Sequence, residues 1–130
     1  MASAAARQPD ADVIAQTARQ TALNLAVDDT YGLWELLWGL HTDFPQAPPP
    51  HLQSIACRVL ADLIREGLIA LVSGRAGGKE EPLPAAQALN ALDQLASWAE
   101  PQRLGDAETR FVATEAGRHA YFGEARPVKS

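Results

Sequence analysis

Apolar residues recur at helical spacing most clearly in the segment 50–66, "PHLQSIACRVLADLIRE". One face of this segment carries residues at i, i+3, i+4, i+7 and i+11, namely Leu52, Ile55, Ala56, Val59 and Leu63. Pro50 suits the first turn of a helix, because the backbone N–H that proline lacks has no partner there. Gly67 follows where a left-handed residue commonly ends a helix. The pattern therefore predicts a helix over 50–66.

A first helix is predicted over residues 10–26. Asp10 or Asp12 can cap it, because a carboxylate accepts hydrogen bonds from the free N–H groups of the first turn. Its apolar face is mostly small and consists of Val13, Ala18, Ala22 and Leu25. A face of this kind gains little by burial unless the helix packs closely on a neighbour.

A second helix is predicted to begin at Asp29 or Thr30 and to contain "TYGLWELLWGLH". One stripe of it carries leucine and a second carries tryptophan: Leu33, Leu37 and Leu40, and Trp34 and Trp38. A helix that is apolar around most of its circumference is predicted to be central and buried. The following "TDFPQAPPP" cannot be helical, because proline removes donors and restricts the residue before it.

The second half of the chain alternates short apolar runs with a longer helical pattern. "LIALVS" (68–73) and "TRFVAT" (109–114) are predicted strands. Between them, about residues 83–98 form a predicted helical insertion. Thr114 can cap a last helix, "EAGRHAYF". Residues 1–9 are predicted to be a disordered N-terminus, 10–122 a single domain and 123–130 a frayed tail.

Two short motifs resemble the winged helix-turn-helix superfamily, especially multiple-antibiotic-resistance-regulator-like proteins. In that family a recognition helix ends in a leucine-rich pattern followed by Gly-Leu-Ile, which Leu60, Leu63, Gly67, Leu68 and Ile69 match. A two-stranded wing follows, and its second strand runs into a helix start that Thr114, Glu115, Ala116 and Gly117 match. The resemblance covers residues 29–122. It implies a mainly α fold with a small two-stranded antiparallel β-wing, in a single winged-helix-like domain.

The chain departs from this family in two places. The family places a separate helix before the recognition helix, to brace it against DNA. Here the proline-rich "TDFPQAPPP" occupies that position and is too short for such a helix. The wing also carries the helical insertion at about 83–98, where a DNA-binding wing is normally a slim hairpin. Both departures weigh against DNA binding.

The composition of the chain indicates which classes of partner and which cellular compartment to expect. The chain of 130 residues has a formal net charge of −5, and its lysines and arginines are scattered. Nucleic-acid binders usually carry a basic face, which the sequence does not show. Cys57 is the one cysteine, no apolar run approaches the length of a membrane span, and charges interrupt the N-terminal segment. A cytoplasmic location is the expectation.

No catalytic constellation is evident. In "GLIALVSGRAGGKEE" (67–81), Gly74 and Gly78 have three residues between them, where a phosphate-binding loop has four, and Lys79 is followed by Glu80, so the spacing and hydroxyl of such a loop are missing. A hairpin turn after a strand is the preferred interpretation. The histidines His41, His51 and His119 lack metal-ligand spacing. Cys57 lies on or beside an apolar stripe. We expect no enzyme activity, no cofactor and no metal site.

The leading hypothesis is a non-catalytic, acidic winged-helix module that binds another, basic protein. An immunity protein that neutralises a basic nuclease toxin is one form of it. The candidate contact residues are Trp98 as an exposed aromatic anchor, and Asp62, Glu66, Glu80 and Glu81. Arg58 and Asp62 are interpreted as an i,i+4 pair on a solvated face.

The alternative is a dimeric winged-helix transcriptional regulator that binds DNA. Residues 10–26 would then form the homodimer. The candidate DNA contacts are Gln53, Arg58, Arg65, Arg75 and Lys79.

Overall fold

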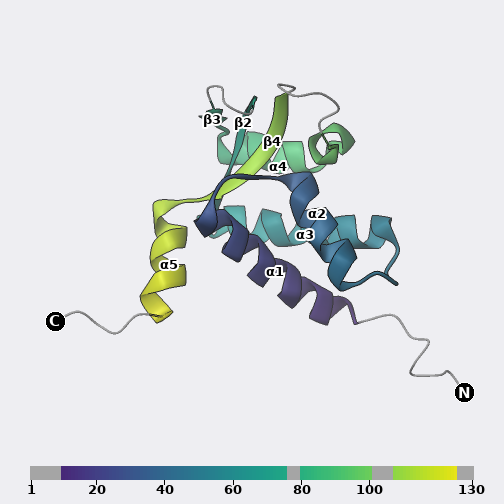
Figure 1. Ribbon diagram of the computed structural model, residues 1–130. Helices are drawn as coiled ribbons and strands as arrows, with labels where there is room; N and C mark the ends of the chain where they lie inside the picture. The colour runs from purple at the N-terminus through teal and green to yellow at the C-terminus, as the bar shows by residue number, and fades with distance from the viewer. Residues whose placement is uncertain (1–9, 76–79, 101–106, 126–130) are drawn as a thin grey trace, which may run out of the picture.

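The computed structural model describes residues 10–75, 80–100 and 107–125. These residues form a mainly helical structure with one small antiparallel sheet (Figure 1). In chain order the elements are α1 (Ala11–Asp28), β1 (Tyr31–Gly32), α2 (Leu33–Asp43), α3 (Pro49–Arg65), β2 (Ile69–Arg75), β3 (Glu80–Pro82), α4 (Ala85–Leu92), the 3-10 helix η2 (Leu95–Trp98), β4 (Ala107–Ala113) and α5 (Glu115–Ala125).

The sheet has four strands in the order β1-β4-β2-β3, where two were expected. The predicted pair is present, since β2 and β4 are antiparallel and place Leu71 opposite Phe111 in the core. Two short strands extend it at the edges. Three residues of β3 pair with β2, and two residues of β1 pair with β4. Strands this short carry no alternating pattern, so the sequence could not show them.

The two strands that flank the glycine segment, β2 and β3, are paired and antiparallel, which confirms the hairpin interpretation on both sides of the turn. Ser73 lies opposite Glu81 and Gly74 opposite Glu80 in the β2–β3 pair. The strand β3 stands where a phosphate-binding loop would need the start of a helix. The turn itself, residues 76–79, lies outside the described residues.

Helix α1 is confirmed as a small-faced helix that packs closely. Asp10 is its cap, with its carboxylate accepting from the Asp12 N–H at 2.9 Å. The buried stripe is one residue out of step with the expectation at both ends. Ile14, Ala18, Ala22 and Ala26 are buried, whereas Val13 is exposed and Leu25 is only half-buried. This face lies against α3, α2 and β4.

Helix α2 starts three or four residues later than expected and is buried on one side only. Tyr31 and Gly32 pair with β4 as a strand, and the Glu35 carboxylate accepts from the Gly32 N–H at 2.9 Å, which fixes the first turn. The inner stripe is Leu33, Leu36 and Leu40. The expectation of a buried central helix is wrong, because Trp38 is 70% exposed.

Helix α3 is the most deeply packed element and directly follows another helix. It is covered by α1, α2, α4 and β2, and seven of its side chains are buried. The expectation that "TDFPQAPPP" cannot be helical is wrong at both ends, because Thr42 and Asp43 end α2 and Pro49 and Pro50 begin α3. Residues 44–48 connect the two helices, which contact each other. Gly67 ends the helix at φ 78°, as predicted, with the Leu68 N–H donating to the Leu63 carbonyl at 2.9 Å.

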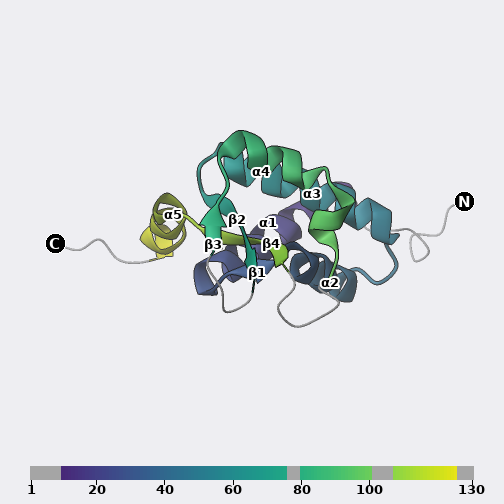
Figure 2. The ribbon, with the colours of Figure 1, turned by 90° about the horizontal axis from the view of Figure 1, so that it is seen from above.

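The predicted insertion at about 83–98 is two helical pieces. Helix α4 ends at Leu92, and the turn at Asp93 and Gln94 leads into η2. Figures 1 and 2 both place α4 alongside α3, in agreement with their contacts. The break lets Trp98 turn inward, where its indole N–H donates to the Leu92 carbonyl at 2.9 Å.

Helix α5 starts on a tight backbone contact. The Thr114 hydroxyl accepts from the Gly117 N–H at 2.9 Å, which confirms the predicted cap, and donates to the Gly67 carbonyl at 2.6 Å. A Cβ at Gly117 would stand 1.9 Å from the carbonyl oxygen of Leu68. Only glycine fits there. The helix continues to Ala125, so the expected tail from 123 onward is helical in its first residues.

We predict that Gly117→Ala lowers the free energy of unfolding by about 1–3 kcal/mol, because α5 must move away from the backbone of Leu68. Urea denaturation monitored by circular dichroism measures the change.

Gly123→Ala is the matched control in the same helix. A Cβ at Gly123 meets nothing within 4 Å, so alanine is expected to stabilise α5 by up to about 1 kcal/mol. Equal effects of the two substitutions would contradict the close contact at Gly117.

Candidate functional site

All three tryptophans of the chain line one shallow groove of about 270 Å³. Trp34 and Trp38 come from α2, one turn apart, and Trp98 comes from η2. The remaining lining residues are Leu37, His41, Pro49 and Glu100. The groove exists because the turn after α4 brings η2 beside α2, as both ribbon views show (Figures 1 and 2). We call it the tryptophan groove.

The three indoles differ in what holds them. Trp98 is buried and bonded to the Leu92 carbonyl. Trp34 is half-buried, and its indole N–H donates to Glu108 Oε1 at 3.0 Å. Trp38, at 70% exposure, presents the largest apolar surface that the described residues leave in solvent. Two indoles of the groove are therefore held in place, and the third is exposed.

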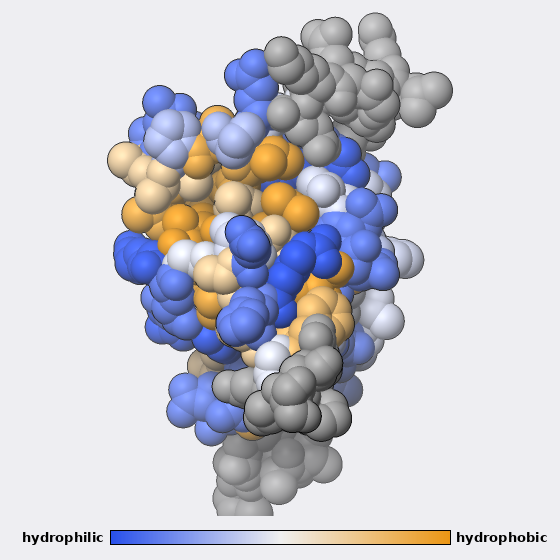
Figure 3. Space-filling model, turned by 90° about the vertical axis from the view of Figure 1, so that its left-hand side faces the viewer, coloured by the Kyte–Doolittle hydropathy of each residue, from blue (hydrophilic) through white to orange (hydrophobic). Residues whose placement is uncertain are grey.

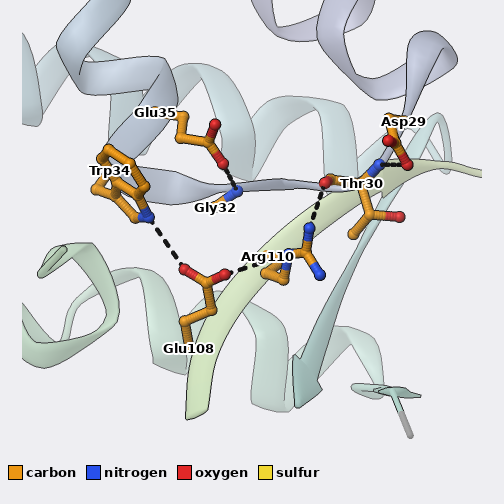
Figure 4. Close-up of polar contacts among 7 residues, drawn as sticks. All are labelled: Asp29, Thr30, Gly32, Trp34, Glu35, Glu108 and Arg110. Atoms are coloured by element: carbon orange, nitrogen blue, oxygen red, sulfur yellow. Dashed lines mark hydrogen bonds and ion pairs between the residues drawn. The ribbon is translucent and has the colours of Figure 1, made fainter. Parts of the chain in front are cut away.

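A partly buried ion pair holds Trp34 in place (Figure 4). Glu108 and Arg110 lie on the same face of β4, and 3.4 Å separates Arg110 Nε from Glu108 Oε2. The side chain of Arg110 is 19% exposed and that of Glu108 is 12% exposed. Arg110 Nη2 also donates to the Thr30 carbonyl at 2.7 Å, which ties the start of β1 to β4. The charge of Arg110 is thus engaged by Glu108 and by the backbone. One wall of the groove is anchored to the sheet.

The two stretches of sequence that supply the lining residues, 20–57 and 80–102, contain carboxylates and no lysine or arginine. No lysine or arginine occurs between Arg19 and Arg58, or between Lys79 and Arg103. The same stretches contain eight carboxylates: Asp28, Asp29, Glu35, Asp43, Glu80, Glu81, Asp93 and Glu100. Glu100 lines the groove itself and is exposed. The lysines, arginines and acidic residues of the chain are thus distributed so that these stretches contribute acidic side chains alone.

The predicted protein-contact residues do not form one surface. Trp98 was expected to be an exposed anchor, and this is wrong, because it is 5% exposed and completes the core beside η2. Asp62 pairs with Arg65 at 3.5 Å, rather than with Arg58. Glu66 accepts two hydrogen bonds from Arg19 of α1, at 2.8 and 3.0 Å. Glu81 is exposed on β3, and the side chain of its neighbour Glu80 is outside the described part.

The residues predicted to contact DNA also lie in different surroundings. Arg58 and Arg65 are exposed on one face of α3, and Gln53 is half-buried beside α4. Gln53 lines a hollow of about 450 Å³ together with Cys57, Leu92 and Asp93. Arg75 ends β2, but its side chain is not described, and Lys79 lies outside the described residues. The insertion therefore covers the flank of α3 that Gln53 would need for base contacts.

Cys57 has the character of a structural thiol. Its sulfur lies 3.5 Å from the Leu92 carbonyl and 3.9 Å from Asp93 Oδ1. Burial raises the pKa of the thiol, and the Asp93 carboxylate raises it further. The histidines lie exposed on three different helices, α2, α3 and α5. Within residues 10–75, 80–100 and 107–125, no three histidine, cysteine or acidic side chains gather as metal ligands do.

A second hollow lies on the α5 side of the molecule. It has a volume of about 580 Å³ between α1 and α5 and is lined by Arg19, Gln20, Leu23, Leu68, Gly117, Ala120 and Tyr121. Figure 3 shows this side, where apolar patches alternate with hydrophilic side chains. The Tyr121 hydroxyl donates to Asn24, which joins the two helices across the hollow. Arg19 and Tyr121, two polar residues of the lining, are bonded to Glu66 and Asn24. We therefore interpret the hollow as part of the contact that holds α5 on α1.

The sequence prediction missed the exposure of Trp38 because it took both the leucine and the tryptophan stripes of α2 as buried, and placed Leu37 in the leucine stripe instead of Leu36. The signal was present in the spacing: Leu33, Leu36 and Leu40 form an i, i+3, i+7 stripe, and Trp38 lies outside it. Once this stripe is assigned to the core, Trp38 must face outward.

None of the helices in the described parts of the chain has the length and apolarity needed to cross a membrane. Comparisons with protein-family models, curated proteins and solved structures find no match to this chain.

The Arg19–Glu66 pair gives a testable pH dependence. The hydrogen bonds from Arg19 lower the pKa of Glu66, so the pair stabilises the fold above the ordinary glutamate pKa and loses its effect as the pH falls. We predict a coupling of at most about 1 kcal/mol in a cycle of Arg19→Ala and Glu66→Gln at pH 7, because both side chains are over 40% exposed.

The coupling is measured by urea denaturation at pH 7 and again near pH 4. The same cycle on Asp62 and Arg65, whose closest atoms are 3.5 Å apart, is the control and should give less. A coupling that is absent at pH 7, or that grows as the pH falls, would contradict the structure.

Proposed function

We propose that the chain is a non-catalytic module that binds another protein, with the tryptophan groove as its docking surface. The observation that carries this proposal is the 70% exposure of Trp38 in a groove that two anchored indoles also line. Leaving this area of indole in water costs free energy that a partner would recover. Tryptophan is also among the residues most enriched at the energetic centres of protein interfaces.

The charge around the groove supports a basic partner. The groove lies in cation-free stretches of a chain with a net charge of −5, and Glu100 is on its wall. Opposite potentials on two proteins speed their association and disfavour wrong partners. A neutraliser of a basic toxin is one concrete form of such a module.

We predict that Trp38→Ala weakens binding of the natural partner by roughly tenfold or more, since truncation of a central tryptophan usually costs above about 1 kcal/mol. Wild-type and variant chains are immobilised, proteins retained from the native host are identified, and the purified partner is titrated by calorimetry.

Phe122→Ala is the matched control, because Phe122 is an exposed aromatic residue on α5 that does not line the groove. It should leave the affinity within about twofold. A partner that binds the Trp38→Ala chain as tightly as the wild type would overturn the proposal.

A DNA-binding regulator is the second candidate, and the contact between α2 and α3 favours it. The resemblance to winged-helix proteins requires a helix directly before the recognition helix, and α2 takes that place in the chain. The exposed face of α3 carries Ser54, Arg58, Asp62 and Arg65, in which one acidic residue offsets one of the two cations. Dimerisation through residues 10–26 would need the outer face of α1, because its apolar stripe faces the chain's own core.

The DNA candidate predicts that the chain shifts a duplex from its own upstream region, and that Arg58→Ala weakens this binding and reduces its salt dependence. An electrophoretic shift assay at several salt concentrations measures both. Arg118→Ala, which removes an exposed cation of α5, is the control. The protein-binding proposal predicts no shift at physiological salt, and a shift sensitive to Arg58 but not to Arg118 would reverse the order of the two candidates.

A further inference from the structure

We propose that the tryptophan groove takes the side chain of an arginine or lysine from a basic partner protein, with the cation over Trp38 and beside Glu100. This inference rests on the proposed function and names what enters the groove. An exposed indole from α2 and an exposed carboxylate from the segment after η2 line the same groove, and this juxtaposition carries the inference.

The exposed indole supplies the first half of such a site. A cation above the face of an aromatic ring is attracted by the negative charge of the π system, and tryptophan gives the strongest attraction. Trp98 is fixed by its bond to Leu92 and Trp34 by its bond to Glu108, so the walls beside Trp38 are already in place. Little ordering is needed on binding, which favours a short, single-side-chain contact.

The carboxylate supplies the second half. Glu100 is the one acidic residue among the described residues of the lining, and no lysine or arginine is among them. Asp43 and Glu35, on α2, and Asp93, before η2, add to the negative potential of the same elements. Arginine fits better than lysine, because its planar guanidinium can stack on the indole while it bonds to the carboxylate.

Other occupants fit less well. A proline-rich segment would use the aromatic walls but would gain nothing from Glu100. A nucleic-acid base could stack on Trp38, but its phosphates would then approach an area with four carboxylates and no cation on the same elements.

Titration of the full chain with short synthetic peptides, followed by tryptophan fluorescence and calorimetry, tests the inference. The probes are a glycine-spaced arginine peptide, its lysine counterpart, its citrulline counterpart, a polyproline peptide and a single-stranded oligothymidylate. We expect the arginine peptide to bind most tightly, the lysine peptide less tightly, and the citrulline peptide, which keeps the shape without the charge, at least about fivefold more weakly.

Two variants assign the binding to the groove. Glu100→Gln should weaken the arginine peptide by about two- to fivefold, and Trp38→Leu by about fivefold or more. Glu81→Gln removes one exposed carboxylate from β3, away from the groove lining, and should change the affinity by less than about twofold.

The outcomes separate this inference from the proposed function. Equal binding of the arginine and citrulline peptides, tighter binding of polyproline or oligothymidylate, or equal effects of Glu100→Gln and Glu81→Gln overturn the cation site. No binding of the arginine peptide at millimolar concentration overturns it too. The proposed function survives each of these results if Trp38→Ala still weakens the natural partner while Phe122→Ala does not.

Discussion

The packing of α1 on α3 is the constraint on which the rest of the structure depends. Three alanines of α1, Ala18, Ala22 and Ala26, are fully buried, and side chains this small allow a close approach of the two helices. Helix α3 thereby becomes the centre of the molecule, with α2, α4 and β2 arranged around it. Because only one stripe of α2 can reach this core, Leu33, Leu36 and Leu40 point inward, and Trp34 and Trp38 lie outside that stripe.

The outward tryptophans acquire a surrounding wall only because the insertion between β2 and β4 breaks at Asp93. A single continuous helix after Leu92 would carry Trp98 past the core, whereas the turn into η2 places it against α2. The ion pair of Glu108 and Arg110 then holds Trp34 from the side of the sheet. Three elements that are distant in the sequence thus shape one groove, and neither the groove nor its acidity belongs to any single motif.

Much of the fold followed from local sequence signals. The cap at Asp10, the helix stop at Gly67, the strand pair β2–β4 and the Thr114 cap each depend on residues a few positions apart, and each was predicted. The site was not predicted. The exposure of Trp38, the burial of Trp98 and the contact of Gly117 with the Leu68 carbonyl depend on which elements meet in space, and periodicity within one segment cannot supply that.

The most direct test of the account is whether Trp38 is exposed in a negative field. Quenching of tryptophan fluorescence by caesium and by iodide ions at matched ionic strength measures this, since a field of carboxylates concentrates cations and repels anions. We predict an accessible emission component that caesium quenches more strongly than iodide, each taken relative to its quenching of free N-acetyltryptophanamide, and that Trp38→Phe removes. An emission that resists both ions, or that iodide quenches as well as caesium does in wild type, would contradict it.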